Sequence, residues 1–290
     1  MKGFRDRTYG VFRRLMRMAS GKLLARGIGS FGALAGGLAS QARITRALMM
    51  REMVTRYGRE GLGFLWVVGE PLLFCLGVIV MWSVLKPAYE HGVRVGAFVM
   101  TGYMCLLLLR HFIQHSLGAI QANIGLLHHR QVRIIHVYVA RALVEFMGTT
   151  TAFLAVFVIL LLIGQVSFPK DPLLLYWGWI SLAWLSFGLA LLLSALAVRF
   201  EVVERITQLF TYMLIPLSGA FFTVSIVPAA YREEFLLVPM PNAVEMVRAG
   251  FFGEFFEAYY HPTYPALFGT VLLFFALIVL SSALKYVDVE

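Results

Sequence analysis

The sequence predicts an all-α membrane protein with six transmembrane helices. Apolar residues make up 60% of the 290-residue chain and charged residues only 14%, whereas soluble domains average roughly 45–50% and about 25%. Six continuous apolar stretches each approach the roughly 20 residues that a helix needs to cross a bilayer. Lipid offers no partner to a free backbone N–H group, so each stretch must be helical, and their continuity excludes a barrel. The stretches are 64–85, 95–113, 142–164, 173–198, 206–227 and 264–284.

Positive charge is concentrated before the first apolar stretch. Residues 1–60 hold 13 of the 25 Lys and Arg residues against three acidic ones, and the rest of the chain is nearly neutral. Such a segment suits anionic lipid headgroups better than nucleic acid. We expect residues 1–45 to form a basic N-terminal extension with a flexible linker over 27–40, and residues 46–290 to form the membrane domain. Basic residues interrupt every early apolar stretch, so no cleavable signal peptide is predicted.

The basic residues also predict the orientation, because Lys and Arg are retained on the cytoplasmic side of the membrane. If both termini lie inside, the cytoplasmic segments hold 20 basic residues and the outer segments hold five. The prediction is therefore N-in and C-in. The five outer residues are Lys86, Arg94, Lys170, Arg232 and Arg248.

Three segments between the apolar stretches have patterns of their own. In residues 47–60, apolar residues recur at three- and four-residue intervals and so share one helix face, with Glu52 on the opposite face. This pattern predicts a cytoplasmic amphipathic helix that lies in the plane of the membrane–water interface. Residues 114–136 form a cytoplasmic loop that is too long for a simple turn. Residues 228–263 are divided by prolines into short external helices, whose Phe and Tyr side chains belong at a membrane–water boundary.

Catalytic motifs are missing from the sequence, which contains no P-loop, no H-E-x-x-H and no nucleophile elbow. The run Gly27–Gly32 fits a dinucleotide fingerprint, but it lacks the preceding strand that such a site requires. His111 and His115 could share a metal ion, although interface histidines are the favoured interpretation. Cys75 and Cys105 lie inside apolar stretches, where cysteine commonly acts as a small apolar filler. We therefore expect no catalytic residue, no metal and no cofactor bound by this chain.

Polar groups inside apolar stretches are costly, so they indicate either a function or a hydrogen bond between helices. Both interpretations remain open for the polar face of the fifth stretch. Glu70 precedes Pro71 in the first stretch and is expected to pair with a basic residue. The candidates for lining a path are Gln208, Thr211 and Tyr212 in the fifth stretch and Tyr103 and Arg110 in the second.

Four short runs resemble landmarks of the permease subunits of polysaccharide-exporting ABC transporters, in particular the capsular, KpsM-like members. They occur in the expected order between residues 46 and 290, on a matching six-helix topology. The sequence departs from the pattern in its long N-terminal extension, at Gln131, where proline often follows the arginine, and at Pro241-Asn242, which reverses the usual order. The four runs are LGFLW at 62–66 with Glu70-Pro71, LGAIQANIGL at 117–126 with Arg130, ARALVE at 140–145, and SGAFF at 218–222 before Pro228.

The resemblance implies a homodimer in the bacterial inner membrane, bound to two cytoplasmic ATPase subunits that hold ATP and magnesium. The dimer would export a lipid-linked, usually acidic polysaccharide toward a periplasmic adaptor and an outer-membrane channel. Arg51, Arg56 and Arg59 would border the polymer's entrance, or would only anchor the amphipathic helix to lipid. A short helix within 116–130 would dock the ATPase. Its docking residues would be Gln121, Asn123, Leu126, His128, His129 and Arg130.

Other interpretations of the same pattern exist. Within the class, a permease for O-antigen or teichoic-acid-type glycans would have the same features. A secondary transporter would need paired broken helices at mid-membrane, and the sequence offers only one such break. A membrane glycosyltransferase would need an acidic metal or nucleotide site, and no Asp-x-Asp occurs.

Overall fold

The computed structural model describes residues 37, 39–55, 63–85, 89–90, 93–127 and 132–287 of the chain. The chain divides into two units, Met1–Ala47 and Leu48–Glu290. In the first unit, residues 37 and 39–47 are helical. The second unit is described below. Several residues that carried predictions lie outside the described ranges, namely the run Gly27–Gly32, Arg56, Arg59, Lys86, His128, His129 and Arg130.

The second unit is nearly all helical in its described part. Its long helices are α2 (Gly63–Leu85), α3 (Val95–Ser116), α5 (Ile134–Leu162), α6 (Pro172–Arg199), α7 (Glu201–Leu217), α9 (Pro239–Phe252) and α10 (Tyr264–Val287). A small antiparallel hairpin of β1 (Tyr89–Glu90) and β2 (Val93–Arg94) joins α2 to α3. The shorter helices are η2 (Gln121–Asn123), α4 (Ile124–Leu127), η3 (Val224–Ile226), η4 (Ala229–Tyr231), α8 (Arg232–Leu236) and η5 (Gly253–Phe255).

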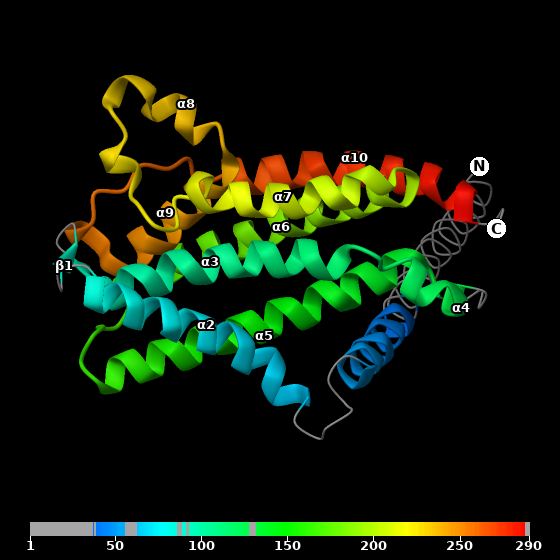
Figure 1. Ribbon diagram of the computed structural model, residues 1–290, viewed down its shortest axis with the longest axis horizontal. Coiled ribbons are helices and arrows are strands. Elements are labelled where there is room, and N and C mark those ends of the chain that lie inside the picture. The colour runs from blue at the N-terminus through cyan, green and yellow to red at the C-terminus, as the bar shows by residue number, and fades with distance from the viewer. Residues whose placement is uncertain are drawn as a thin grey trace, which may run out of the picture. The chain divides into compact units, whose positions relative to one another are not determined.

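Helix α3 is the core of this unit, and the other long helices lie lengthwise around it (Figure 1). In its most apolar window 94% of the residues are buried, against 17% for α2 and 22% for α10. Helices α2 and α5 pack on one side of α3, whereas α6 and α9 pack on the other, and α10 covers α6. Helices α2 and α10 therefore present most of their apolar surface outward.

Five described helices are long and apolar enough to cross a membrane, judged by length and composition: Leu65–Leu85, Val95–Ser116, Ile134–Leu162, Pro172–Arg199 and Tyr264–Ala283. Four of them nearly match the predicted first, second, fourth and sixth stretches. The third prediction began too late, because α5 starts at Ile134 rather than at 142. The predicted stretch begins directly after Arg141, because a charged residue is costly in lipid. In the structure Arg141 lies inside the protein and is paired with Glu52, so its charge does not mark the start of the helix.

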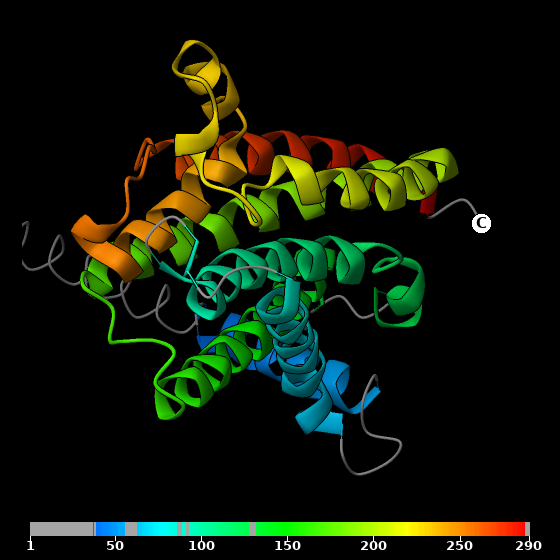
Figure 2. The same ribbon diagram turned by 60° about the vertical axis from the view of Figure 1, so that its left-hand side comes forward.

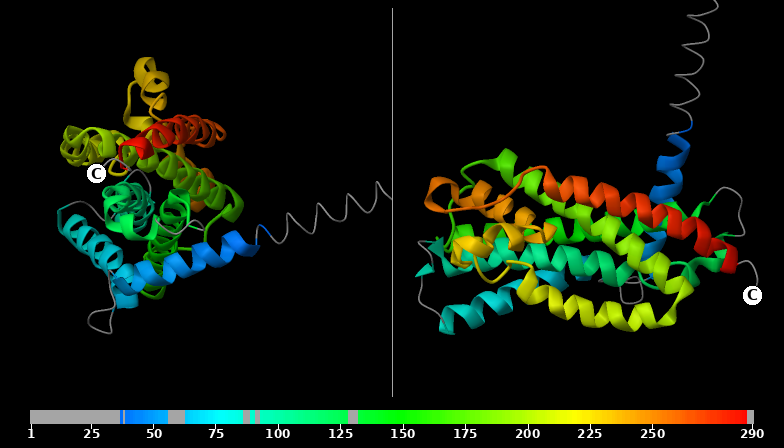
Figure 3. Two further views of the ribbon diagram at one scale, coloured as in Figure 1. Left: turned by 90° about the vertical axis from the view of Figure 1, so that its right-hand side faces the viewer. Right: turned by 90° about the horizontal axis from the view of Figure 1, so that it is seen from above.

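The fifth predicted span, 206–227, does not match the structure in its second half. Helix α7 has 17 residues and ends at Leu217, which is short of the roughly 20 that a bilayer requires. Gly219 then takes a φ of +69°, a conformation that favours glycine and turns the chain away from the helix. Helix α7 contacts α6 and α3 and diverges from α6 beyond the turn that joins the two helices (Figure 3).

The segment between α7 and α10 confirms the prediction of short helices separated by prolines. Pro228 precedes η4, Pro239 starts α9, and Pro262 precedes α10. Elements η3, η4 and α8 stand out to one side (Figure 2), and α9 then returns to pack against α6 and α3. We call the end of the bundle with this segment and the β-hairpin the hairpin end, and the opposite end the C-terminal end.

Candidate functional site

Four of the five residues predicted to line a path meet at a groove between α3 and α7, near the C-terminal end of the bundle. The groove has a volume of about 310 Å³. Residues three and four apart on a helix share a face, and α7 therefore presents a continuous polar row to α3. The polar lining residues are Arg110, Gln114, Glu204, Thr207, Gln208, Thr211 and Tyr212.

Arg110 supplies the positive charge of this groove. Its guanidinium lies 5.8 Å from the centre of the Tyr212 ring, within the range of a cation–π contact. Its Nε atom is buried and has no hydrogen-bond partner in the part of the chain that the structure describes. The Thr211 hydroxyl donates to the Gln208 carbonyl of its own helix, whereas Tyr212 is 64% exposed. Arg110 is half-buried, while Gln114, Glu204, Gln208 and Tyr212 are exposed, so all five are available to a ligand in this groove.

Tyr103, the fifth predicted residue, lies elsewhere. It is about two helical turns from Arg110 on α3 and is buried in an aromatic cluster. Its ring centre is 5.9 Å from that of Phe221, which is 5.4 Å from that of Trp82. Glu70, on α2, is half-buried and forms no ion pair with any described residue, so its expected basic partner is not found there.

A second polar cluster joins α3 to α5. The Glu145 carboxylate is 3% exposed, and its two oxygens lie 3.7 Å from His111 Nδ1 and 3.5 Å from His115 Nε2. The two histidines expected at an interface therefore flank one buried carboxylate. Within the described ranges, no three His, Cys, Asp or Glu side chains are grouped so that they could hold a metal ion.

Arg141, one turn before Glu145, extends this cluster to the amphipathic segment 48–55. Its Nε lies 2.9 Å from Glu52 Oε1, and its Nη1 donates to the His115 carbonyl at 2.9 Å. Arg51 next to Glu52 donates to Asn123 Oδ1 at 2.7 Å. We call these four residues, Arg51, Glu52, Asn123 and Arg141, the tether network. It joins the amphipathic segment to α5 and to η2.

The segment between α3 and α5 contains the predicted short helix, in the form of η2 and α4. Gln121 is exposed and Leu126 is half-buried. Asn123 instead faces inward, is 4% exposed, and donates to the Ala119 carbonyl at 2.9 Å. Gln121 and Leu126 are therefore at the surface, while Asn123 holds the segment in place.

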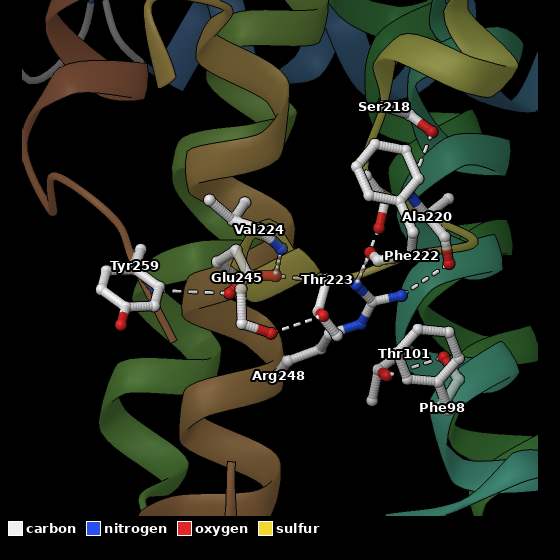
Figure 4. A network of polar contacts seen from close by, with 12 residues as sticks. Phe98, Thr101, Ser218, Ala220, Phe222, Thr223, Val224, Glu245, Arg248 and Tyr259 are labelled. Carbon is white, nitrogen blue, oxygen red and sulfur yellow. Dashed lines mark hydrogen bonds and ion pairs between the residues drawn. The ribbon is translucent and has the colours of Figure 1, made fainter. Parts of the chain in front are cut away.

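A third polar cluster closes the hairpin end (Figure 4). Arg248 on α9 is fully buried, and its guanidinium donates to the carbonyls of Gly219, Ala220 and Phe222 at 2.7, 2.5 and 2.7 Å. The same guanidinium lies 4.0 Å from the centre of the Phe98 ring on α3. Arg248 was counted among the basic residues on the outer side of the membrane, and in the structure its side chain is buried and supports the turn after α7.

Glu245, one turn before Arg248, completes this cluster. Its Oε1 lies 3.8 Å from Arg248 Nη1 and accepts the Val224 N–H, while Oε2 accepts the Tyr259 N–H. Burial raises the pKa of Glu245 to about 7, although Arg248 and the two N–H groups oppose that shift. The carboxylate thereby links α9 to the segments on both sides of it.

Sequence reasoning missed the Glu145 and Glu245 clusters as sites, although a signal was present. Glu145 lies within an apolar stretch, where a charged residue must find a partner in the protein. Arg141 and Glu145 are also spaced for one helix face, as are Glu245 and Arg248. The helix that supplies the partners is decided by the packing of the helices, and a local sequence pattern does not predict that packing.

Comparison with known proteins is consistent with this arrangement. A family model described as ABC-2 type transporter matches residues 43–252. The capsule polysaccharide export inner-membrane protein CtrC of Neisseria meningitidis serogroup B is 38% identical over 251 residues, which cover 87% of this chain and 95% of that protein. A Haemophilus influenzae protein named BexB, with the same description, is 34% identical over the same shares. The polysialic acid transport protein KpsM of Escherichia coli is 27% identical over 83% of this chain and 93% of its own.

The long apolar helices around α3, with a polar groove on one side, define a multi-pass membrane transporter. The chain belongs to the ABC-2 type transporter family.

Proposed function

We propose that this chain is the membrane-spanning subunit of an ATP-driven exporter of capsular polysaccharide in the bacterial inner membrane. Similarity over most of its length to proteins named for capsule polysaccharide export supports the substrate class and the location. The structural observation that carries the proposal is the polar groove between α3 and α7. With both termini in the cytoplasm, this groove lies near the cytoplasmic side.

A homodimer would turn this groove into one wall of a conduit. Gln208 and Tyr212 are exposed on α7, and an exposed polar face is costly against lipid. A second copy across α7 would remove that cost and enclose the polar groups. The polymer would then pass between two α7 helices, and Arg110 of each copy would face it.

Arg110 also supports an acidic polymer. A buried guanidinium nitrogen without a partner in the described part of the chain is suited to a carboxylate or phosphate, since hydrogen bonds between charged groups are the strong ones. One relative is named for polysialic acid, which is acidic. The lipid anchor of the polymer would remain in the apolar surroundings of the helices.

ATP hydrolysis would take place in two separate cytoplasmic subunits, because the chain has no P-loop for ATP and magnesium. These subunits would dock on η2 and α4, where Gln121 and Leu126 reach the surface. The tether network would pass their motion to segment 48–55 and to α5. A periplasmic adaptor and an outer-membrane channel would receive the polymer.

The test is to delete this chain from its bacterium and to measure surface polysaccharide and polymer retained in the cell. We expect the polymer to accumulate inside, and a plasmid copy to restore export. Co-purification should recover an ATPase whose hydrolysis rate rises when the lipid-linked polymer is added. Undiminished surface capsule without the chain would contradict the proposal, and a selective loss of O-antigen or teichoic-acid-type glycan would assign the chain to that substrate instead.

A further inference from the structure

The outward face of α2 carries a carboxylate in the apolar part of the bundle. A groove of about 460 Å³ runs along this face, and all of its described lining residues belong to α2 itself. Glu70 lies in this groove, two turns after the start of the helix at Gly63. It is half-buried and pairs with no residue in the described part of the chain. One copy of the chain therefore leaves this acid without a counter-charge.

A carboxylate on this face needs protein or water beside it, since ionisable groups in spanning helices almost always face one of the two. Gly77, two turns further along the same groove, favours protein. A methyl group at Gly77 would meet no atom within 4 Å, so nothing within one copy requires glycine there. Small residues allow two helices in a membrane to approach closely. The groove on α2 therefore suits a neighbouring helix from outside this copy.

The groove between α3 and α7 has the complementary charge. Arg110 is half-buried there, and its Nε atom is buried without a hydrogen-bond partner among the described residues. Glu204 is the acidic residue among the described lining residues, and it forms no ion pair with Arg110. Removing a charge from water is costly unless the charge is paired. An acid from outside this copy would therefore stabilise Arg110.

Glu70 and Arg110 lie at the same depth in the bundle. The β-hairpin joins the end of α2 at Leu85 to the start of α3 at Val95. Fifteen residues separate Glu70 from Leu85, and fifteen separate Arg110 from Val95. Both side chains therefore lie about 22 Å of helix from the hairpin end. A two-fold axis along the membrane normal preserves depth, so Glu70 of one copy lies at the level of Arg110 in the other.

The order of the helices also brings the two grooves together in a dimer. Helices α2 and α7 lie on opposite sides of α3 (Figure 1, Figure 3). When a dimer forms on the face shared by α2, α3 and α7, the two-fold rotation places α2 of one copy against α7 of the other. Each α2 then covers the groove of the partner copy, and the contact occurs twice.

We propose that Glu70 of one copy pairs with Arg110 of the other and closes the groove until an acidic polymer replaces it. The acidic groups of the polymer compete with Glu70 for the guanidinium, so substrate opens the groove. This inference rests on the proposed function, because it takes the homodimer and the acidic polymer from it. It adds a residue from the partner copy to a groove that is incomplete in one copy.

Cross-linking in membranes tests the pair. Cys75 and Cys105 are replaced, and two differently tagged full-length chains are produced together, one with Glu70→Cys and the other with Arg110→Cys. A short bifunctional thiol reagent should link chains that carry both tags. The reagent replaces the reach of the two long side chains, since a direct disulfide requires Cα atoms within about 7 Å. Val84→Cys is the matched control for Glu70→Cys and should give no such linkage, because Val84 is exposed on α2 about 21 Å of helix closer to the hairpin end.

Binding of an acidic probe tests the competition. The wild-type chain and Glu70→Gln are purified at full length in phosphatidylcholine nanodiscs, and an oligomer of sialic acid is added. Glu70→Gln should bind the oligomer severalfold more tightly, because the competing carboxylate is gone. A merely structural role of Glu70 would not raise the affinity. Glu233→Gln removes a carboxylate that is 79% exposed outside the groove, and it should bind as the wild type does.

Two results would overturn the inference. If positions 70 and 110 give no chains linked through both tags, or if position 84 gives equal linkage, Glu70 does not lie at Arg110 of the partner copy. Equal affinity of the wild type and Glu70→Gln for the oligomer would show that the two acids do not compete. Either result is compatible with capsule export, so the proposed function would stand. Linked chains whose deletion leaves capsule export intact would instead overturn the proposed function.

Discussion

Arg248 is the residue on which most of the hairpin end depends. It satisfies three carbonyls of the turn after α7 and reaches the core helix α3 through Phe98. Gly102 of α3 makes this approach possible, since a side chain there would collide with the Ala220 carbonyl and with the Arg248 guanidinium. The close approach of these segments requires glycine at this position.

Gly102→Ala should therefore destabilise the protein by about 1–3 kcal/mol, the usual cost of overpacking. Thermal unfolding of the purified protein in detergent measures the change. Gly69→Ala in α2 is the matched control, because a methyl group there meets no atom within 4 Å. Equal melting temperatures for the two variants would show that the turn can move away at little cost.

Glu245 should make stability depend on pH. Burial raises its pKa from 4.5 to about 7, so between these values the folded protein keeps a proton that the unfolded chain loses. This stabilisation is complete below pH 4.5 and is lost as the pH rises through about 7, and it amounts to at most about 3 kcal/mol. Wild-type melting temperature should fall over this window more steeply than that of Glu245→Gln.

Glu233→Gln is the control for that measurement, because the Glu233 carboxylate is at the same end of the bundle but is 79% exposed. This variant should keep the wild-type pH dependence. If Glu245→Gln keeps it as well, the titrating group is another residue.

At the scale of elements, the tether network connects segment 48–55 to α5 and to η2. Glu52 and Arg141 are both largely buried, so reversing one charge leaves two like charges facing each other in the protein. Glu52→Arg should reduce polymer-stimulated ATP hydrolysis severalfold while the ATPase still co-purifies. Breaking a buried pair costs about 3–5 kcal/mol. The double variant Glu52→Arg, Arg141→Glu should recover part of the rate, and no recovery would mean that the pair does not act as a unit.

Helix α7 should have one face in contact with water and another in contact with lipid. Single cysteines at Gln208 and Tyr212, beside Arg110, should react with a water-soluble thiol reagent after Cys75 and Cys105 are replaced. Cysteines at Leu209 and Met213 should react poorly, because thiols surrounded by lipid do not ionise. These two side chains are 66% and 61% exposed, so poor labelling there cannot come from burial within one copy. The reverse labelling pattern would mean that another face of α7 lines the conduit.

For the whole molecule, the proposed dimer makes α7 an interface and leaves α10 in lipid. A cysteine at Tyr212 should be joined to its copy in membranes by a bifunctional thiol reagent long enough to cross the conduit, since the two conduit walls face each other across the symmetry axis. A cysteine at Phe274, which is similarly exposed on α10 at 63%, should remain monomeric with the same reagent. Cross-linking at 274 alone would place the dimer axis on the opposite side of the bundle.

The sequence predicted those features that depend on the bilayer or on one helix face. The bounds of α2, α3, α6 and α10 follow from apolar length, and the grouping of Arg110, Gln208 and Tyr212 follows from helical periodicity. The start of α5 and the end of α7 were wrong because each depends on a distant partner. Arg141 can lie inside the protein only because Glu52 is there, and the turn at Gly219 is held by Arg248. The binding roles of the site residues stay predictions.

The contacts of Arg248 also constrain the order in which the chain can mature. Its three carbonyl partners precede it by 29, 28 and 26 residues, so a ribosome completes the turn after α7 well before it adds the arginine. During that interval these carbonyls cannot accept hydrogen bonds from the Arg248 guanidinium, and burying them unpaired would be costly. The turn that ends α7 therefore reaches its final conformation late in biosynthesis, after α9 has been synthesised and has packed against α3.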